Sequence, residues 1–243
     1  MMALGRSRPA AIRVLGRRYR TPALTSEREI PYTIRRSDRA RRASVSVDPD
    51  RGVEVVLPRR SPERQAARVV AELGPWIERR LAAQARARDA VHGPPGTVPY
   101  LGVPLALVPE PGRMRVHRRG DALLVPEDDP GPALERWYRR AARDEIAPRA
   151  QEAAAAVGAR VTALTIRGQR TRWGSCSPSG ALSFNWRLLL APEPVLDYVV
   201  VHEACHLKVA DHSPRFWSLL ERHCPDWRDH ARWLRLNGSA LTF

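Results

Sequence analysis

Residues 195–206, VLDYVVVHEACH, form a largely apolar stretch that ends with three strongly polar side chains, His202, Glu203 and His206. If this segment is a helix, the residues before His202 make it apolar on nearly every side, which is typical of a buried helix. Burying two histidines and a glutamate there is costly unless a metal ion or close partners satisfy them. The segment therefore predicts a fold built around a buried helix that carries a polar site.

The spacing of these side chains points to a metal. His202 and His206 are four residues apart, so in a helix both imidazoles project from one face about one turn apart. Two ring nitrogens can then reach one tetrahedral zinc ion at roughly 2.0–2.1 Å. Glu203 would stand beside the open coordination position, where a carboxylate accepts a proton from zinc-bound water and passes it to the leaving amine. We interpret this HExxH pattern as the active helix of a zinc-dependent peptidase with one zinc ion per chain.

A catalytic zinc needs a third protein ligand, and His212 is the leading candidate. It follows His206 by six residues, which is the interval of the extended signature HExxHxxGxxH. Val209 replaces the glycine of that signature and no methionine follows, so the chain shares the spacing without being a metzincin. Three alternatives lie further along the chain, and spacing does not exclude them: Glu221, His223 and His230.

Composition limits the location of the protein. No apolar run approaches the roughly 18–20 residues of a membrane span, and the basic N-terminus lacks the apolar core of a secretory signal. Three cysteines without a CxxC pair argue against a disulfide framework or a cysteine-built zinc finger. We expect a cytoplasmic protein without a membrane partner. We interpret Cys176 as a small buried residue rather than an inhibitory thiolate.

The formal net charge of +15 invites a nucleic-acid partner. However, Lys208 is the only lysine among 41 basic residues, and alanine and proline are abundant. This pattern is as typical of a GC-rich coding bias as of a phosphate-binding surface. We therefore expect a polypeptide substrate and do not favour nucleic acid as a partner. The oligomeric state is not predicted.

The elements expected along the chain indicate an α+β protein. After a loosely ordered basic extension at 1–29, the N-terminal α+β region at 30–128 has strands near 32–36, 43–47, 53–57, 100–108, 113–117 and 122–125. A helix should begin at Ser61-Pro62-Glu63 and divide at Gly74-Pro75. The region 129–243 should hold a long helix to about 157, a strand at 161–167 and a hairpin over 171–186. Three further helices are expected at 193 to about 209, 213–223 and 226–236. One edge of that hairpin is suited to pairing with an extended peptide substrate.

Several of these segments resemble the YgjP-like metallopeptidases, which are related to the SprT-like and WLM zinc proteases. The resemblance rests on RWGSCSPSGALSFNWRL at 172–188, DYVVVHEACHLKVADHSPRFW at 197–217 and CPDWRDHARWL at 224–234, and residues 31–60 are also similar. It covers most of 31–236 and implies a zincin-like catalytic unit of an active helix, a small antiparallel sheet and C-terminal helices. By position, it implies His202, His206 and His212 as zinc ligands and Glu203 as the catalytic acid and base. Cys205 stands where family members often have leucine or alanine.

The resemblance also supplies the alternative function. Because of the SprT-like relatives and the arginine content, the alternative is a nucleic-acid-associated zinc protein that acts on DNA-bound proteins. The main hypothesis remains a metalloendopeptidase-like zinc hydrolase. It predicts that peptide bonds are cleaved by a water molecule activated by zinc and Glu203.

Overall fold

The structure, a computed structural model, describes residues 23–25, 28–48, 51–168 and 172–243. The chain divides into two compact units, Met1–Ala82 and Ala83–Phe243. Residues 1–22, which belong to the expected basic extension, lie outside the described residues. The end of that extension contains strands β1 (Ala23–Thr25) and β2 (Arg28–Ile30), which pair antiparallel.

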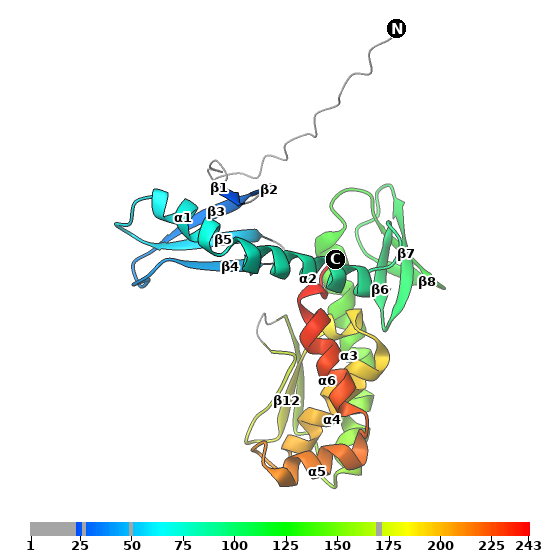
Figure 1. The fold of residues 1–243 in the computed structure, drawn as a ribbon. Coiled ribbons are helices and arrows are strands. Elements are labelled where there is room, and N and C mark those ends of the chain that lie inside the picture. Colours follow the sequence, from blue (N-terminus) through cyan, green and yellow to red (C-terminus); the bar gives the residue numbers. More distant parts are fainter. Residues whose placement is uncertain (1–22, 26–27, 49–50, 169–171) are drawn as a thin grey trace. The chain divides into compact units, whose positions relative to one another are not determined.

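The N-terminal unit is built on a three-stranded sheet. Strands β3 (Tyr32–Ser37), β4 (Ser44–Asp48) and β5 (Gly52–Pro58) lie in the order β3-β5-β4, with β3 parallel and β4 antiparallel to β5. Alternate residues of β5, including Val55 and Leu57, are buried in one apolar core with Ala66 and Val70 of α1 (Arg64–Glu72). Alternate residues of β5 and the apolar face of α1 therefore form one small core. Helix α1 lies beside the sheet of β3, β4 and β5 (Figure 1).

Helix α2 (Gly74–Val91) follows α1 after Leu73, so the two helices are divided where Gly74-Pro75 predicted. Helix α1 begins at Arg64 rather than at Ser61, and its N-cap Glu63 makes no side-chain capping bond. Its N-terminal end lacks the serine cap that the sequence predicted. The first half of α2 adds Ile77 to the N-terminal core.

The C-terminal unit begins with a four-stranded sheet. Its strands are β6 (Thr97–Tyr100), β7 (Val103–Glu110), β8 (His117–Arg119) and β9 (Ala122–Pro126), in the order β6-β7-β9-β8. Leu105 and Leu123 of this sheet belong to the same apolar core as the helices that follow it. These strands therefore share a compact unit with residues 129–243, whereas the sequence placed a domain boundary at 128/129.

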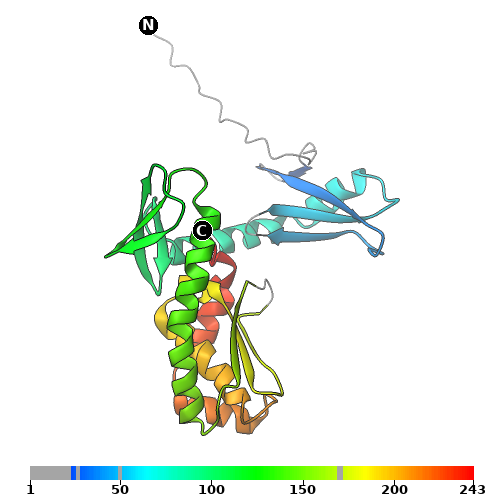
Figure 2. The same cartoon turned by 180° about the vertical axis from the view of Figure 1, so that it is seen from behind.

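A second sheet and a long helix support the functional region. Helix α3 (Gly131–Ala156) is continuous through Pro148 and runs alongside strands β10 (Ala163–Arg167), β11 (Gly174–Cys176) and β12 (Ala181–Asn185) (Figure 2). The sheet order is β10-β12-β11, so β12 is central and β11 lies at an edge. The predicted hairpin of β11 and β12 is present, but β10 runs parallel to β12, which makes the sheet mixed rather than antiparallel.

The remaining elements are helical. The 3₁₀ helix η1 (Trp186–Leu190) leads into α4 (Glu193–His206), α5 (Pro214–His223), α6 (Trp227–Asn237) and the short η2 (Gly238–Ala240). Helix α4 is buried on most sides, since Leu196, Val199, Val200 and Cys205 all belong to the core. Small sheets together with these helices confirm the predicted α+β class. In the described part of the chain, no helix is both long enough and apolar enough to cross a membrane.

Candidate metal centre

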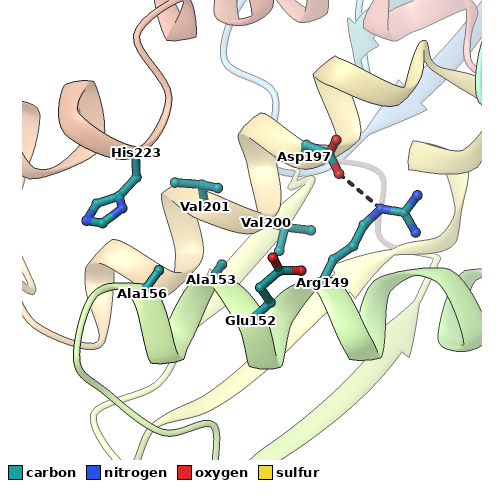
Figure 3. Close-up of a pocket in the computed structure, with 8 residues that line it drawn as sticks. All are labelled: Arg149, Glu152, Ala153, Ala156, Asp197, Val200, Val201 and His223. Atoms are coloured by element: carbon teal, nitrogen blue, oxygen red, sulfur yellow. Dashed lines mark hydrogen bonds and ion pairs between the residues drawn. The ribbon is translucent and has the colours of Figure 1, made fainter.

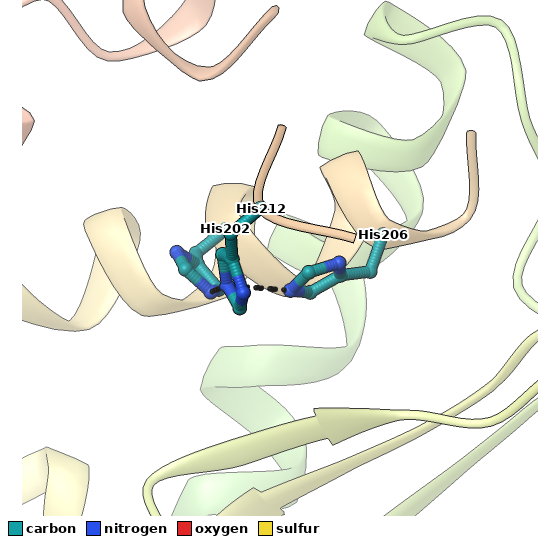
Figure 4. A group of neighbouring side chains, drawn as sticks. All are labelled: His202, His206 and His212. Atoms are coloured by element: carbon teal, nitrogen blue, oxygen red, sulfur yellow. Dashed lines mark hydrogen bonds between the residues drawn. The ribbon is translucent and has the colours of Figure 1, made fainter. Parts of the chain in front are cut away.

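Three histidine side chains meet where α4 ends and α5 begins (Figure 4). His202 and His206 come from the last turns of α4, and His212 lies just before α5. The Nε2 atom of His212 lies 3.1 Å from Nε2 of His202 and 3.2 Å from Nε2 of His206. Within the described part of the chain, these three form the one group of potential metal ligands with all ligand atoms inside 4.8 Å.

A chain reversal after α4 brings His212 back to the helix. The amide of Val209 donates to the carbonyl of Cys205 (3.0 Å), and the buried Val209 side chain fixes this turn. The Nδ1 atom of His206 lies 3.0 Å from the carbonyl oxygen of Val209. Since a carbonyl oxygen only accepts, Nδ1 carries the proton and the lone pair of the neutral ring is on Nε2, which faces the other histidines.

The electrostatics of the site disfavour the charged forms of His202 and His206. Burial, followed by the neighbouring His206 and His212, lowers the pKa of His202 to about 4. Burial also lowers the pKa of His206. Neutral imidazole is the form that binds a metal ion.

The separation of the nitrogen atoms fits a metal ion. Tetrahedral ligands at about 2.0–2.1 Å from zinc stand roughly 3.3 Å from one another. The two observed separations, 3.1 and 3.2 Å, are close to this value. Lone pairs that converge at such distances repel one another unless a cation or a proton lies between them, so the donor set fits a zinc ion.

Helix α5 provides the support beneath the histidines. Phe216 is fully buried, and its ring centroid lies 4.9 Å from that of His202, 4.4 Å from His206 and 4.8 Å from His212. Trp217 stacks on the outer side of His212 at 5.4 Å. One aromatic residue therefore contacts all three imidazoles, and no spacing rule in the sequence marked it.

Glu203 occupies a separate position on α4. It follows His202 by one residue, which is about 100° around the helix, and only 7% of its surface is exposed. Burial raises its pKa from 4.5 to about 7. A carboxyl group that titrates near neutrality can both accept and return a proton, as general acid–base catalysis requires.

Gly174 in the edge strand β11 makes room for this carboxyl group. A Cβ atom added at Gly174 would lie 2.5 Å from both Cγ and Oε1 of Glu203, which is closer than packed atoms approach. Glycine is therefore the residue that lets β11 lie directly against the Glu203 side chain. A glycine inside a strand signals such a close approach, so the sequence did contain a sign of this contact.

Cys176 at the end of β11 is a partly buried free thiol. Burial, followed by the nearby Glu203, raises the pKa of this thiol. Its sulfur atom lies 3.5 Å from the carbonyl oxygen of Ser177. These surroundings favour the neutral thiol over a metal-binding thiolate.

The other candidate ligands lie elsewhere. Glu221 forms an ion pair with Arg228 at 2.6 Å, and the ring of His230 lies 6.4 Å from Tyr198. His223 lines a cavity of about 360 Å³ between α3 and α4, together with Arg149, Glu152, Ala153, Ala156, Asp197, Val200 and Val201 (Figure 3). Val200 is two residues before His202, roughly 200° around the helix, so this cavity opens on another face of α4.

Of three comparisons with known proteins, the one with protein families identifies a relationship for this chain. The family described as "YgjP-like, metallopeptidase domain" matches residues 41–237. Among solved structures, the crystal structure of the metallopeptidase zymogen of Pyrococcus abyssi abylysin is similar over 37% of this chain and 92% of its own, with 22% sequence identity and a TM-score of 0.34. A comparison with curated proteins finds no match. Since the family match covers most of the sequence, it alone makes the assignment: the chain belongs to the YgjP-like family of metallopeptidases.

Proposed function

We propose that His202, His206 and His212 bind one zinc ion and that Glu203 is the acid and base of a metalloendopeptidase. The convergence of three histidine nitrogens, with His212 Nε2 3.1 Å and 3.2 Å from Nε2 of His202 and His206, is the observation that carries this proposal. Three histidine ligands leave a fourth coordination position open, as is typical of catalytic zinc sites. When bound there, zinc would polarise the scissile carbonyl and acidify a water molecule.

Glu203 would transfer the proton. Its carboxylate accepts a proton from the attacking water and then donates it to the nitrogen atom of the departing amine, which leaves the carboxylate ready for another cycle. In the metal-free protein, burial raises the pKa of Glu203 to about 7, so a proton can reside on this carboxyl group near neutral pH.

The edge strand β11 supports a polypeptide as substrate. Of its two sides, one pairs with β12 and the other is not paired with a described strand. An extended peptide can add to such an edge through backbone hydrogen bonds. Because β11 lies against Glu203 at Gly174, a peptide bound there would pass beside the proposed catalytic carboxyl group. The described cysteines are free, which suits the cytoplasm as the proposed location.

The test separates ligand from catalyst. Wild-type protein loaded with zinc should contain one metal ion per chain by elemental analysis and hydrolyse a fluorogenic peptide library. His206→Ala should lose both the metal and hydrolysis. Glu203→Gln should keep the metal and the fold, with kcat lower by about 10²–10⁴-fold, because proton transfer alone is removed. A metal-free wild type after reconstitution, or near-normal turnover by Glu203→Gln, contradicts the proposal.

A further inference from the structure

The N-terminal unit carries more positive charge for its length than the rest of the chain. Residues 1–82 contain 19 basic and nine acidic residues, a net charge of +10, whereas residues 83–243 contain 22 and 17, a net charge of +5. The frequency of acidic residues is nearly the same in both parts, so the difference lies in the arginines. A coding preference for arginine over lysine changes the identity of the cations but does not concentrate them in one unit.

The topology of the N-terminal sheet gathers many of these arginines at one end. Ser37 at the end of β3 is opposite Pro58 at the end of β5, and Ser44 at the start of β4 is opposite Val56. The β3–β4 loop and the segment from β5 to α1 therefore lie at the same end of the sheet (Figure 1). We call this region the arginine end; it comprises Arg36, Arg39, Arg41, Arg42, Arg59, Arg60 and Arg64.

Two of these seven side chains are neutralised locally. Arg59 pairs with Asp38 at 3.1 Å, and Arg36 lies 3.8 Å from Glu63. Arg36 also donates to the backbone carbonyls of Arg59 and Ser61, both at 2.8 Å, which ties the β5–α1 segment to β3.

The other five guanidinium groups have no such partner. They are all exposed, and the ion pairs among the described residues include none of them: Arg39, Arg41, Arg42, Arg60 and Arg64. Like charges held together at one end of a small unit repel one another and lower its stability. An anionic partner would remove this cost.

We infer that the arginine end binds the phosphate backbone of a nucleic acid. A guanidinium group presents paired N–H donors that match the oxygen atoms of a phosphate. Three adjacent strands span roughly 10 Å, and one nucleic-acid strand places a phosphate about every 3.4 Å along a duplex axis. The loops at this end of the sheet can therefore face several successive phosphates. Backbone contacts of this kind carry no base information, so the binding is independent of sequence.

The surroundings favour a nucleic acid over an anionic membrane. Amphipathic helices that lie on membranes combine cationic residues with large apolar side chains that insert into the bilayer. At the arginine end the neighbouring residues are small, as with Ala40, Ala43 and Ser61. The exposed Leu73 and Trp76 of this unit follow the other end of α1, roughly 13 Å of helix away.

The experiment measures nucleic-acid binding by the full-length, zinc-loaded protein. Fluorescence anisotropy with a labelled 20-nucleotide DNA, single-stranded and duplex, is recorded from about 50 to 400 mM NaCl, a range over which the Debye length shortens roughly threefold. Replacing Arg39, Arg41 and Arg42 together by glutamine should weaken binding at least tenfold at low salt. It should also reduce the slope of log K against log salt by about 2–3, since each lost phosphate contact contributes about 0.9 on duplex DNA.

A matched variant tests whether position or total charge matters. Arg136, Arg140 and Arg235 are exposed and lie in the C-terminal unit, so their replacement by glutamine removes the same charge from another place. This control should change the affinity and the slope far less than the first variant. Equal weakening by both variants overturns the inference, as does a wild-type chain that ignores DNA but binds vesicles containing phosphatidylserine.

Peptide hydrolysis provides the check on folding. Because the arginine end is separate from the residues proposed for catalysis, both triple variants should hydrolyse peptides as the wild type does. A wild-type chain that hydrolyses peptides but does not bind DNA would overturn this inference and leave the peptidase proposal standing. Loss of hydrolysis in His206→Ala with DNA binding retained would support it.

Discussion

Among the described residues, each unit of the chain buries one glutamate, and the two glutamates differ in whether an arginine pairs with them. Glu54 in the N-terminal sheet is 8% exposed and pairs with Arg35 at 3.0 Å, whereas Glu203 on α4 is 7% exposed and no ion pair of the described residues includes it. The N-terminal core has eight buried apolar residues and the C-terminal core has 31. A large core can offset the cost of an unpaired buried acid, and a small one compensates its acid with a cation. The larger unit therefore holds the buried glutamate without an ion pair among the described residues, and the smaller unit neutralises its buried glutamate with an arginine.

The largest expected effects concern the two cores. Leu57 and Leu189 are both fully buried, one in each unit, and each substitution by alanine should lower the stability of its own unit by about 2–5 kcal/mol. Leu57→Ala should shift an unfolding transition in calorimetry while peptide hydrolysis keeps its temperature midpoint. Leu189→Ala should lower that midpoint. If Leu57→Ala lowers it equally, the units unfold together and the comparison fails.

The next prediction sharpens the contrast between the two buried acids. In metal-free protein the pKa of Glu203 is raised from 4.5 to about 7. At pH values between these two, the folded protein holds a proton on Glu203 that the unfolded chain has lost. The free energy of unfolding therefore falls as pH rises through this window, by roughly 3 kcal/mol in all. Glu203→Gln should remove this loss, because glutamine does not titrate.

Urea denaturation of chelator-treated protein at pH 5 and pH 8 checks this point. The variant should gain stability relative to the wild type at pH 8 and differ little at pH 5. Both proteins retain His202, whose lowered pKa acts in the opposite direction, so the difference between them isolates Glu203. Parallel behaviour at the two pH values would show that the Glu203 carboxyl group is not desolvated.

A smaller effect is expected where β11 meets the carboxyl group. Gly174→Ala places a Cβ atom where Cγ and Oε1 of Glu203 lie, so the carboxyl group must move. A displacement of about 1 Å lowers kcat/KM by roughly 10²-fold, while the three histidines keep their metal. Gly131→Ala is the control, because its nearest neighbour would be 3.6 Å away. DNA binding by the arginine end should not change in either variant. If Gly174→Ala hydrolyses peptides as the wild type does, the contact of β11 with Glu203 has no role in catalysis.

The sequence predicted those parts of the fold that depend on local patterns. Helices α4, α5 and α6 were placed within a few residues, because their apolar periodicity, prolines and caps are local signals. Helix α4 ends at His206 rather than near Val209, since the chain turns so that the Val209 carbonyl meets the His206 ring. The proximity of His202 and His206 also follows from helix geometry alone.

Other features depend on turns that the residue types at those positions did not predict. The strand expected at 100–108 is two strands, β6 and β7, joined at Leu101 and Gly102. Both residues have positive φ, 52° and 86°, as a tight two-residue hairpin turn requires, but leucine is an unusual choice for that conformation. The strand expected at 113–117 was wrong, because β8 begins at His117.

Tertiary contacts were beyond a single sequence. Phe216 lies under the histidines only because the chain reverses between α4 and α5, and Gly174 reaches Glu203 only because β11 is an edge strand beside α4. The gathering of arginines in the N-terminal unit depends on β3 and β5 being parallel. Patterns along the chain therefore predicted candidate residues for the chemistry, while the contacts around those residues became visible only in the fold.

The three histidines occupy positions 202, 206 and 212, within eleven consecutive residues of a chain of 243. The conformational entropy lost in closing a loop rises with its length, so these side chains need little of the fold to be brought together. A denatured chain can therefore still chelate an ion with this segment. Ligand that binds the denatured ensemble stabilises the folded state less than its native affinity suggests. Zinc should consequently protect the active helix and the turn that follows it more than it raises the melting temperature of the whole protein.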